Sequence, residues 1–290
     1  MTSVKALVPA KINLWLEVVG KRTDGYHELS TLMLPIAVYD RLEVTLGGDG
    51  VMVQCAHPEV PRDDRNLAWR AADRFRRAAG VSPGVQIRLE KNIPVGAGLG
   101  GGSADAGVLL AVLNNMVGGA LGSAALIELA RGLGADVAFF LRQRPALATG
   151  IGERLEWVDA LPAYPIVLIK PPVMVPTRGI YQKLTLTRKG SLIKIRAFKA
   201  QPWDVQRVME NDLESVTITD FPVIAEIKQW LLQNSALGAL MSGSGPTVFG
   251  IFRTEEQAQS TGDLARRVWP ACWVQVTRVL SGSDDTGVND

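Results

Sequence analysis

A run of glycines is the feature of the sequence that most directly suggests chemistry. Within Pro94–Gly107 (PVGAGLGGGSADAG), five of the seven residues from Gly96 to Gly102 are glycine, and Ser103 follows them. Glycine has no Cβ, so its backbone N–H groups can approach an anion closely. The apolar segment that follows predicts a helix, whose N-terminus would add unpaired N–H donors and the positive end of the helix dipole. The stretch therefore predicts a cradle for phosphate groups.

Two common phosphate-binding motifs do not fit this loop. Gly96, Gly98 and Gly101 match G-x-G-x-x-G, the dinucleotide fingerprint. However, the preceding segment alternates polar and apolar residues, Pro94 interrupts the start of the loop, and no acidic residue lies about twenty positions further on. A Walker A loop would end in Gly-Lys-Ser or Gly-Lys-Thr, whereas this loop ends in GGGSAD without a lysine. An interpretation without a ligand stays open, because glycines also permit tight turns and close packing.

An acidic and a basic residue elsewhere in the chain could act on a bound phosphate and its acceptor. Asp136 lies in GLGADVAFF, between a glycine and apolar residues, where a carboxylate could serve as a general base. It could equally be the N-cap of a helix that begins at Val137. Lys11 shares one face of an alternating strand with Asn13, where a lysine is ordinarily solvated. The residue types alone leave these interpretations open.

The composition limits the classes of partner. The chain has 290 residues, with 31 lysines and arginines against 29 aspartates and glutamates, so a net charge of +2 provides no broad attraction to nucleic acid or an anionic membrane. The start MTSVKALVPAKINL lacks a signal-peptide pattern, and no apolar run reaches the roughly 18 residues of a membrane helix. Cys55 and Cys272 stand alone, which disfavours a disulfide framework or a zinc cluster. We expect a cytoplasmic protein with neither nucleic-acid nor membrane partners.

The hydrophobic pattern predicts strands and helices of an α+β protein in two parts. Residues 3–20 alternate as a long strand, and residues 42–55 predict a hairpin that turns at Gly47–Gly50. A half-exposed strand over residues 85–93 leads into the glycines. Helical patterns cover residues 67–78, 104–116, 123–133, 221–236 and 255–269, and further strands cover residues 164–172, 247–252 and 272–280. We predict an N-terminal domain over residues 1–160, a C-terminal domain over residues 161–280 and a disordered tail over residues 281–290.

The glycine loop resembles the phosphate loop of the GHMP kinases, the family of galactokinase, homoserine kinase and mevalonate kinase. PAKINL (Pro9–Leu14) and MSGSGPTVFGIF (Met241–Phe252) resemble the other two motifs of the family, and all three occur in order. The resemblance covers about residues 5–280. It implies a two-domain fold, with a ribosomal protein S5 domain 2-like N-terminal domain that binds ATP and a ferredoxin-like C-terminal domain on the substrate side.

Two blocks, PAKINLWLEVVGKRTDGYHEL and LGADVAFF, are similar to one branch of the family. This branch uses ATP to phosphorylate the 2-hydroxyl of a cytidine diphosphate-linked methylerythritol, on the non-mevalonate route to isoprenoid precursors. The resemblance implies that Asp136 is the catalytic base and that Lys11 lies beside it, keeps it ionised and supplies the charge that a Walker lysine would supply. The residues implied to bind ATP are Pro94, Gly96, Gly98, Leu99, Gly100, Gly101, Gly102, Ser103, Ala104, Asn66, Leu67 and Lys91. Those implied to bind the acceptor are Asn13, Tyr26, His27, Thr177 and Tyr181.

The aromatic residues of this set would stack on the cytosine ring, with Tyr26 and His27 on one side and Tyr181 on the other. Tyr181 could also serve packing alone, and Asn66 could cap the helix that follows it. Residues 183–203 are basic and could be either an insertion over the substrate or a solvated surface loop.

The chain departs from the family pattern after the glycines. The family usually has two serines there, but Ala104 takes the second place and leaves Ser103 as the hydroxyl available to a phosphate or to Mg²⁺. Mg²⁺ is expected as the counterion of ATP, although we identify no equivalent of the glutamate ligand of several relatives. The oligomeric state, monomer or homodimer, stays open.

Two other functions suit the same fold. A kinase for homoserine or mevalonate is one, and the RTDGYHEL block with its aromatic residues argues against it. A ligand sensor that has lost catalysis is the other, and the presence of both Lys11 and Asp136 argues against that.

Overall fold

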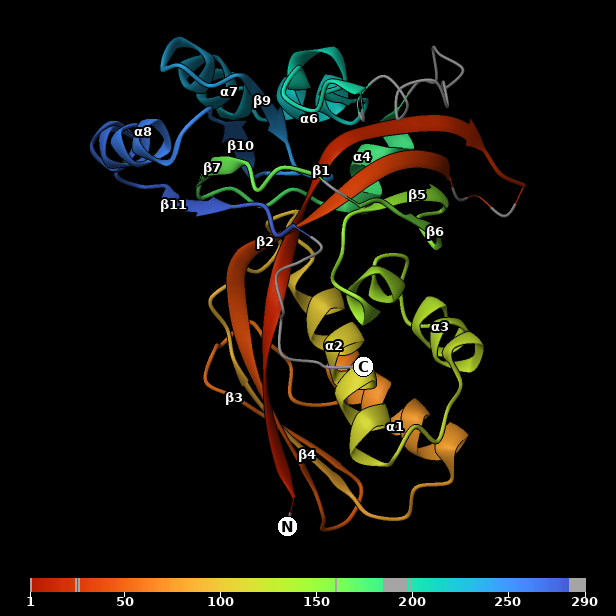
Figure 1. Ribbon diagram of the computed structural model, residues 1–290. Helices are drawn as coiled ribbons and strands as arrows, with labels where there is room; N and C mark the ends of the chain where they lie inside the picture. Colours follow the sequence, from red (N-terminus) through yellow and green to blue (C-terminus); the bar gives the residue numbers. More distant parts are fainter. Residues whose placement is uncertain are drawn as a thin grey trace.

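Two β-sheets organise the chain, one in each half of the molecule (Figure 1). The structure is a computed structural model and describes residues 2–23, 25, 27–159, 161–184, 198 and 200–281. The strands of the first sheet are β1 (Ser3–Lys21), β2 (His27–Leu46), β3 (Val51–Cys55), β4 (Val85–Glu90), β5 (Ala146–Gly150), β6 (Arg154–Trp157) and β8 (Glu210–Asn211). Their order is β3-β4-β2-β1-β8, with β5 paired to β2 and β6 paired to β5.

The helices of the first half cover one face of this sheet (Figure 1). They are α1 (Leu67–Ala79), α2 (Gly101–Met116), α3 (Ser123–Arg131) and the short 3-10 helix η1 (Val137–Leu141). Alternate residues of β2 and β4, such as Val44 and Ile87, pack against Phe75 of α1 and Leu110 of α2 in one buried cluster. Helix α2 is apolar on all sides, as its sequence predicts, because it lies between the sheet, α1 and η1.

The predicted hairpin at Gly47–Gly50 is wrong. β3 does not pair with β2; β4 lies between them, antiparallel to β2 and parallel to β3. The turn pairs instead with Gly84, whose N–H donates to the carbonyl of Gly48 and whose own carbonyl accepts from Gly47 N–H. A Cβ on Gly84 would lie 2.7 Å from the Gly48 backbone, so a glycine is needed here for β4 to start beside the turn.

The long strand β1 alternates between exposed and partly buried residues only over its first five positions. From Val8 to Val18 both faces are buried, because the strand continues into the second half of the molecule. Its register with β2 shifts between Pro9 and Ala10, and again between Asn13 and Trp15. These irregularities change the direction of side chains along the strand.

The second sheet consists of β7 (Pro165–Lys170), β9 (Gly238–Met241), β10 (Val248–Ile251) and β11 (Trp273–Arg278), in the antiparallel order β11-β7-β10-β9. The helices of this half are α4 (Thr177–Lys183), η2 (Val205–Arg207), α6 (Glu214–Asp220), α7 (Val223–Gln233) and α8 (Glu255–Val268). With helices between β7 and β9 and between β10 and β11, this is the β-α-β-β-α-β arrangement of a ferredoxin-like domain. The predicted α+β class and ferredoxin-like second half are confirmed.

The second sheet joins the two halves of the molecule. One of its faces, which includes Val167 and Ile169, packs on α7 and α8. The other face, which includes Ile166 and Leu168, shares a buried cluster with Ile12 of β1. Residues 185–197 of the basic segment and residues 282–290 of the predicted tail lie outside the described residues. None of the described helices is both long and apolar enough to cross a membrane.

We predict that Gly107→Ala destabilises the protein. In a helix interior, alanine is ordinarily more favourable than glycine by about 1 kcal/mol. Here a Cβ on Gly107 would lie 2.5 Å from the Val137 carbonyl oxygen and 2.7 Å from Phe140 Cβ, so α2 and η1 would have to separate. We expect a loss of about 1–3 kcal/mol, measured by chemical denaturation.

The matched control is Gly102→Ala in the same helix, where the nearest atom to a Cβ is Leu67 Cδ1 at 4.0 Å. This variant should unfold no more easily than the wild type. Equal stability of the two variants would contradict the close packing of α2 on η1.

Candidate active site

The glycine loop connects β4 to α2, and its glycines serve different ends. Gly98 and Gly100 have φ values of +77° and +76°, and a Cβ on Gly98 would collide with the Ser242 carbonyl. The tight turn and the close packing therefore explain why Gly98 and Gly100 are glycines. Gly102 has neither a positive φ nor a close neighbour. Its side of the helix N-terminus is open for a ligand to approach the backbone, as the cradle interpretation requires.

Three separate segments meet at this loop. The Lys11 N–H of β1 donates to the Leu99 carbonyl at 2.9 Å. From the turn between β9 and β10, Ser242 Oγ donates to the Gly98 carbonyl at 3.0 Å. Thr247 N–H of the same turn donates to the Ala97 carbonyl at 3.3 Å. The three motifs identified in the sequence thus form one site at the junction of the two halves.

Lys11 is buried, so the interpretation of a solvated lysine is wrong. Only 5% of its side chain is exposed, and its Nζ lies 2.6 Å from Asn13 Oδ1 and 3.7 Å from Asp136 Oδ2. The Asn13 amide is oriented by its donation to Thr31 Oγ1 at 2.8 Å, and that hydroxyl donates in turn to the Trp15 carbonyl. The ammonium is therefore held between an amide oxygen and a carboxylate.

Asp136 precedes η1 but makes no side-chain hydrogen bond to cap it. Its side chain is 34% exposed, so one side of the carboxylate is accessible while the other faces Lys11. Because the capping interpretation has no hydrogen bond to support it, the carboxylate is available for chemistry. A carboxylate at this place can accept a proton from a positioned hydroxyl.

The aromatic residues assigned to the acceptor lie close to this pair. The rings of His27 and Tyr181 are 5.4 Å apart between centroids, with an angle of 32° between their planes. Burial, with a contribution from the negative charge of Asp136, raises the pKa of Tyr181. Burial, together with the charge of Lys21, lowers the pKa of His27, which favours a neutral ring. Tyr26 lies outside the described residues.

Thr177 begins α4, and its Oγ1 lies 2.7 Å from Ser244 Oγ in the turn after β9. Through this contact the start of α4, which also carries Tyr181, is attached to the turn that packs on the glycine loop. The same turn therefore contacts both the glycine loop, to which Lys11 is bonded, and Thr177 of α4.

Comparison with known proteins agrees with this geometry. The family models described as GHMP kinases N terminal domain and GHMP kinases C terminal match residues 66–144 and 195–270. The chain belongs to the GHMP kinase family. It is 45% identical to the 4-diphosphocytidyl-2-C-methyl-D-erythritol kinase of Syntrophotalea carbinolica, over 93% of this chain and 97% of the relative.

Solved structures agree as well. A crystal structure of 4-(cytidine 5'-diphospho)-2C-methyl-D-erythritol kinase aligns with a TM-score of 0.81 at 38% identity, covering 95% of this chain and 99% of that one. A homoserine kinase from Cytophaga hutchinsonii, 22% identical, shares the fold with a TM-score of 0.75 over 97% of this chain and 96% of that one. The family predicted from the sequence is confirmed.

On the side of this GHMP kinase assigned to adenosine, Asn66 is the N-cap of α1. Its Oδ1 accepts from Ala68 N–H at 2.9 Å, and its Nδ2 donates to the Pro61 carbonyl at 2.7 Å. The capping interpretation of Asn66 is confirmed, and a contact with ATP stays a prediction. Leu67, the first residue of α1, is the nearest neighbour of a Cβ on Gly102, so the N-terminal ends of α1 and α2 lie side by side.

Lys91 belongs to a buried cluster that the sequence did not reveal. Its Nζ donates to Asp40 of β2 and, at 2.6 Å, to Asp105 of α2, and only 4% of its side chain is exposed. Asp40 Oδ1 also accepts the N–H groups of Asn92 and Ile93, at 2.6 Å and 2.8 Å. The cluster thus ties the strand that enters the glycine loop to the helix that leaves it. The Lys91 ammonium thus donates to two buried carboxylates, and a contact of Lys91 with ATP stays a prediction.

The charges within this cluster are unequal, with one ammonium and two carboxylates. Burial raises the pKa of Asp105 to about 7, and the nearby Asp40 adds to the rise that Lys91 opposes. Burial alone would lower the pKa of Lys91, but the two carboxylates outweigh it and raise that pKa. Asp105 is the single charged residue of the otherwise apolar α2, and this was the available signal for the cluster.

A cavity of about 660 Å³ lies elsewhere, between α8 and β11, and is lined by residues such as Pro165, Glu255 and Arg278. None of the residues assigned to ATP or to the acceptor lines it. We therefore assign the chemistry to the junction at Lys11, where the hydrogen bonds of three motifs converge.

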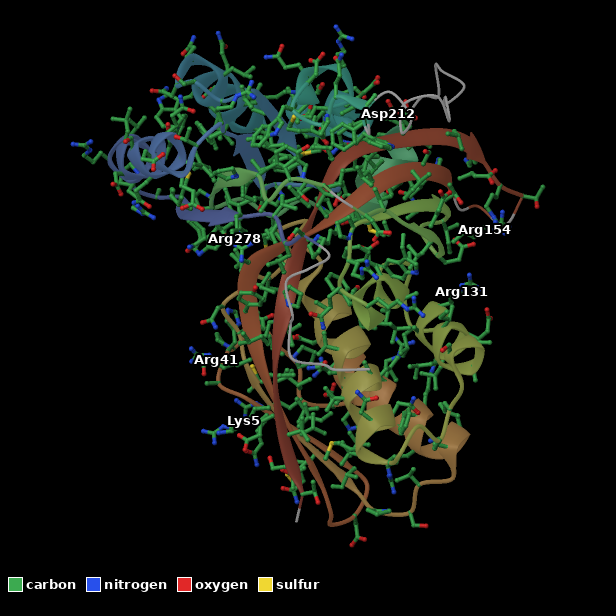
Figure 2. The ribbon with its side chains drawn as sticks, viewed as in Figure 1. Lys5, Arg41, Arg131, Arg154, Asp212 and Arg278 are labelled. Atoms are coloured by element: carbon green, nitrogen blue, oxygen red, sulfur yellow. The ribbon has the colours of Figure 1, made fainter. Side chains whose placement is uncertain are left out.

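We predict that Lys91→Met lowers the free energy of unfolding by about 3–5 kcal/mol, because it leaves two buried carboxylates without their cation. The measurement is denaturant unfolding at neutral pH. The control is Arg41→Met, which removes an ion pair with Glu90 in which the two side chains are 66% and 58% exposed. Figure 2 labels Arg41 at the edge of the molecule. The control should change stability by about 1 kcal/mol or less. An equally small effect at Lys91 would show that the cluster is not needed.

Proposed function

We propose that this GHMP kinase transfers the γ-phosphate of ATP to the 2-hydroxyl of 4-diphosphocytidyl-2-C-methyl-D-erythritol, giving the 2-phosphate and ADP. The reaction is a step of isoprenoid precursor biosynthesis. The observation that carries the proposal is the buried Lys11 ammonium, 3.7 Å from the accessible carboxylate of Asp136 and joined through Leu99 to the glycine loop. The relative from Syntrophotalea carbinolica, matched over 97% of its length, is named for this activity.

In the proposed reaction Asp136 accepts the proton of the acceptor hydroxyl as its oxygen attacks phosphorus. The carboxylate lies 3.7 Å from the Lys11 ammonium, and its 34% exposure leaves it open to a substrate. Phosphoryl transfer needs little covalent chemistry from the protein, so positioning the hydroxyl in line with the leaving oxygen is the main task. Asp136 would then both orient the hydroxyl and accept its proton.

Lys11 stabilises the charge that spreads over the transferring oxygens. Asn13 holds the ammonium from one side, and the carboxylate of Asp136 lies beyond hydrogen-bonding distance of it. A donor of Lys11 can therefore turn toward a phosphate oxygen without leaving its site. In a site shielded from water such a fixed charge acts more strongly than in bulk solvent.

The N-terminus of α2 would receive the phosphates of ATP. The helix begins at Gly101, and Gly102 leaves its backbone open to a ligand. Unpaired N–H groups and the helix dipole attract phosphate there. This arrangement can replace a Walker A loop, because the lysine of that motif is supplied from β1.

Mg²⁺ belongs to the proposal as the counterion of ATP. Among the described residues, no group of three or more His, Cys, Asp or Glu side chains could hold a metal ion. Mg²⁺ bound mainly through substrate phosphates and water needs few protein ligands. The Ser103 hydroxyl, half-buried in the first turn of α2, fits one such ligand. When bound, the ion would neutralise phosphate charge next to the helix N-terminus.

A coupled assay of ADP release tests the proposed acceptor. Purified protein with ATP and Mg²⁺ is given the cytidine diphosphate-linked alcohol, homoserine or mevalonate in parallel reactions. We expect turnover with the first acceptor and none above background with the others. Turnover of homoserine or mevalonate alone would identify another kinase of the family, and no turnover of any acceptor by folded, ATP-binding protein would favour a sensor.

We predict that Asp136→Asn lowers kcat by about 10²- to 10⁴-fold, the usual contribution of a positioned general base. The KM for ATP should change little, because the phosphates bind at the loop. Steady-state kinetics with both substrates varied measures this. The control is Asp159→Asn, an exposed carboxylate of the same half that pairs with Arg144, and its kcat should equal that of the wild type. If Asp136→Asn kept more than half of the wild-type kcat, Asp136 would not be the base.

A second prediction concerns the aromatic contact. Tyr181→Ala should raise the KM for the cytidine-linked acceptor about tenfold or more, because stacking on a base contributes about 1–3 kcal/mol. Tyr181→Phe keeps the ring and should keep the KM. The assay is the same, with ATP saturating. A KM that rises equally in both variants would assign the effect to the hydroxyl and not to stacking.

A further inference from the structure

Asn211 is a buried polar residue that the proposed mechanism does not use. It lies on β8, which consists of two residues and pairs in parallel with β1, so that Asn211 is opposite Leu16. Only 5% of it is exposed. It comes from the second half of the chain but joins the first sheet, beside the strand that carries Lys11. A buried amide in such a place must satisfy its hydrogen bonds internally.

The partners of this amide lie in the turn that follows β9. Asn211 Nδ2 donates to the carbonyls of Met241 and Gly243, both at 2.8 Å. Its Oδ1 accepts from Leu213 N–H at 3.0 Å, which fixes the orientation of the amide group. Both N–H groups of the amide are thus committed to one turn, the same turn that donates to the glycine loop through Ser242 and Thr247.

Gly243 is the point at which this turn meets Lys11. A Cβ on Gly243 would lie 3.4 Å from Lys11 Nζ and 3.6 Å from Asn13 Oδ1, and its φ is +57°. A glycine backbone rotates easily, and a freed carbonyl beside an ammonium would accept a hydrogen bond from it. Such a bond would occupy the Lys11 donor that the phosphate needs. The contact with Asn211 holds this carbonyl in another direction.

We propose that Asn211 is a positioning residue for Lys11: by binding the Met241 and Gly243 carbonyls, it keeps the turn packed beneath the ammonium and leaves the ammonium free for the phosphate. This role rests on the proposed function of Lys11 in phosphoryl transfer. Asn211 itself touches no reacting group. It acts through the direction of the two carbonyls that it binds, above all that of Gly243.

The adjacent residue provides a matched control. Asp212 Oδ2 accepts from Val18 N–H at 2.7 Å, so it attaches the same segment to β1. Among the described residues, its side chain makes no hydrogen bond to the turn after β9. Figure 2 labels Asp212 beside the part of β1 that lies in the second half of the molecule. Asn211→Asp and Asp212→Asn are both isosteric and exchange the same two chemical groups. Asn211→Asp keeps the acceptor for Leu213 N–H but replaces the donor to the two carbonyls with an oxygen.

We expect Asn211→Asp to lower kcat by about 10- to 100-fold, as a small misplacement of a catalytic group does, with little change in the KM of either substrate. Asn211→Ala, which removes the amide without burying a charge, should lower kcat similarly and serves if Asn211→Asp does not fold. Asp212→Asn should keep the wild-type kcat. A kcat near the wild-type value in a folded Asn211 variant, or an equal loss in Asp212→Asn, would overturn the proposal.

A double-mutant cycle tests whether Asn211 acts through Lys11. In the Lys11→Ala background, Asn211→Asp should cause no further loss of kcat, because the group that it positions is already absent. Multiplying losses would mean that Asn211 supports the fold generally and would overturn the positioning role.

A measurement without substrate separates this inference from the proposed function. In protein labelled with ¹⁵N-lysine, the Nζ resonance of Lys11, assigned by its absence in Lys11→Ala, should shift in Asn211→Asp and Asn211→Ala but not in Asp212→Asn. A shift without turnover of the cytidine-linked alcohol by the wild type would mean that the acceptor is wrong while Asn211 still positions Lys11. An unchanged resonance in active protein would overturn the inference and leave the proposed function standing.

Discussion

A buried ammonium must be compensated, and at Lys11 this requirement organises the site. Removing a lysine side chain from water costs several kcal/mol unless nearby acceptors replace the solvent. Here the acceptors are Asn13 on the same strand and Asp136, more than a hundred residues away in the chain. Gly100 completes the site, because a Cβ at that position would lie 3.1 Å from Lys11 Cγ. The strand, the glycine loop and the start of η1 therefore have to be in place together.

The same requirement explains why the long pair of strands runs through both halves of the molecule. Ile12 of β1 packs in the cluster that includes Ile166 and Leu168 of the second sheet. On the opposite face of the strand, Lys11 is covered by the glycine loop and by the turn after β9, because a Cβ on Gly243 would lie 3.4 Å from Lys11 Nζ. Near the other end of the chain, Leu280 N–H donates to the Pro35 carbonyl of β2 at 2.8 Å. Both faces of β1 thus contact the second half of the chain, one through the second sheet and the other, where Lys11 lies, through the turn after β9.

Local patterns predicted much of the fold, and the errors arose where distant segments intervene. The glycine loop, the apolar α2 and the α+β class follow from composition and periodicity, and the family motifs implied the ferredoxin-like half. The hairpin at Gly47–Gly50 failed because β4, 30 or more residues later, takes the place beside β2. The alternation of β1 suggested a solvated Lys11, since nothing near that position in the sequence shows that the glycine loop and the turn after β9 will cover it. Asn211 had no local signal, because its partners lie about 30 residues further along the chain.

The glycine loop has no Walker lysine, but two lysines from other segments, Lys91 and Lys11, lie near it. They differ in the carboxylates that surround them. Lys91 lies between the carboxylates of Asp40 and Asp105, neither of which is more than 5% exposed. Its ammonium binds both and so joins the two ends of the glycine loop. Lys11 has one neighbouring carboxylate, that of Asp136, which lies 3.7 Å away and is 34% exposed. The charge of the ammonium is therefore balanced, but this carboxylate takes none of its hydrogen-bond donors. An ammonium bonded to two buried carboxylates supports the structure, whereas one whose carboxylate lies beyond hydrogen-bonding distance can follow a charge as it moves between oxygens. This difference in surroundings supports the proposal that Lys11, and not Lys91, acts on the phosphate.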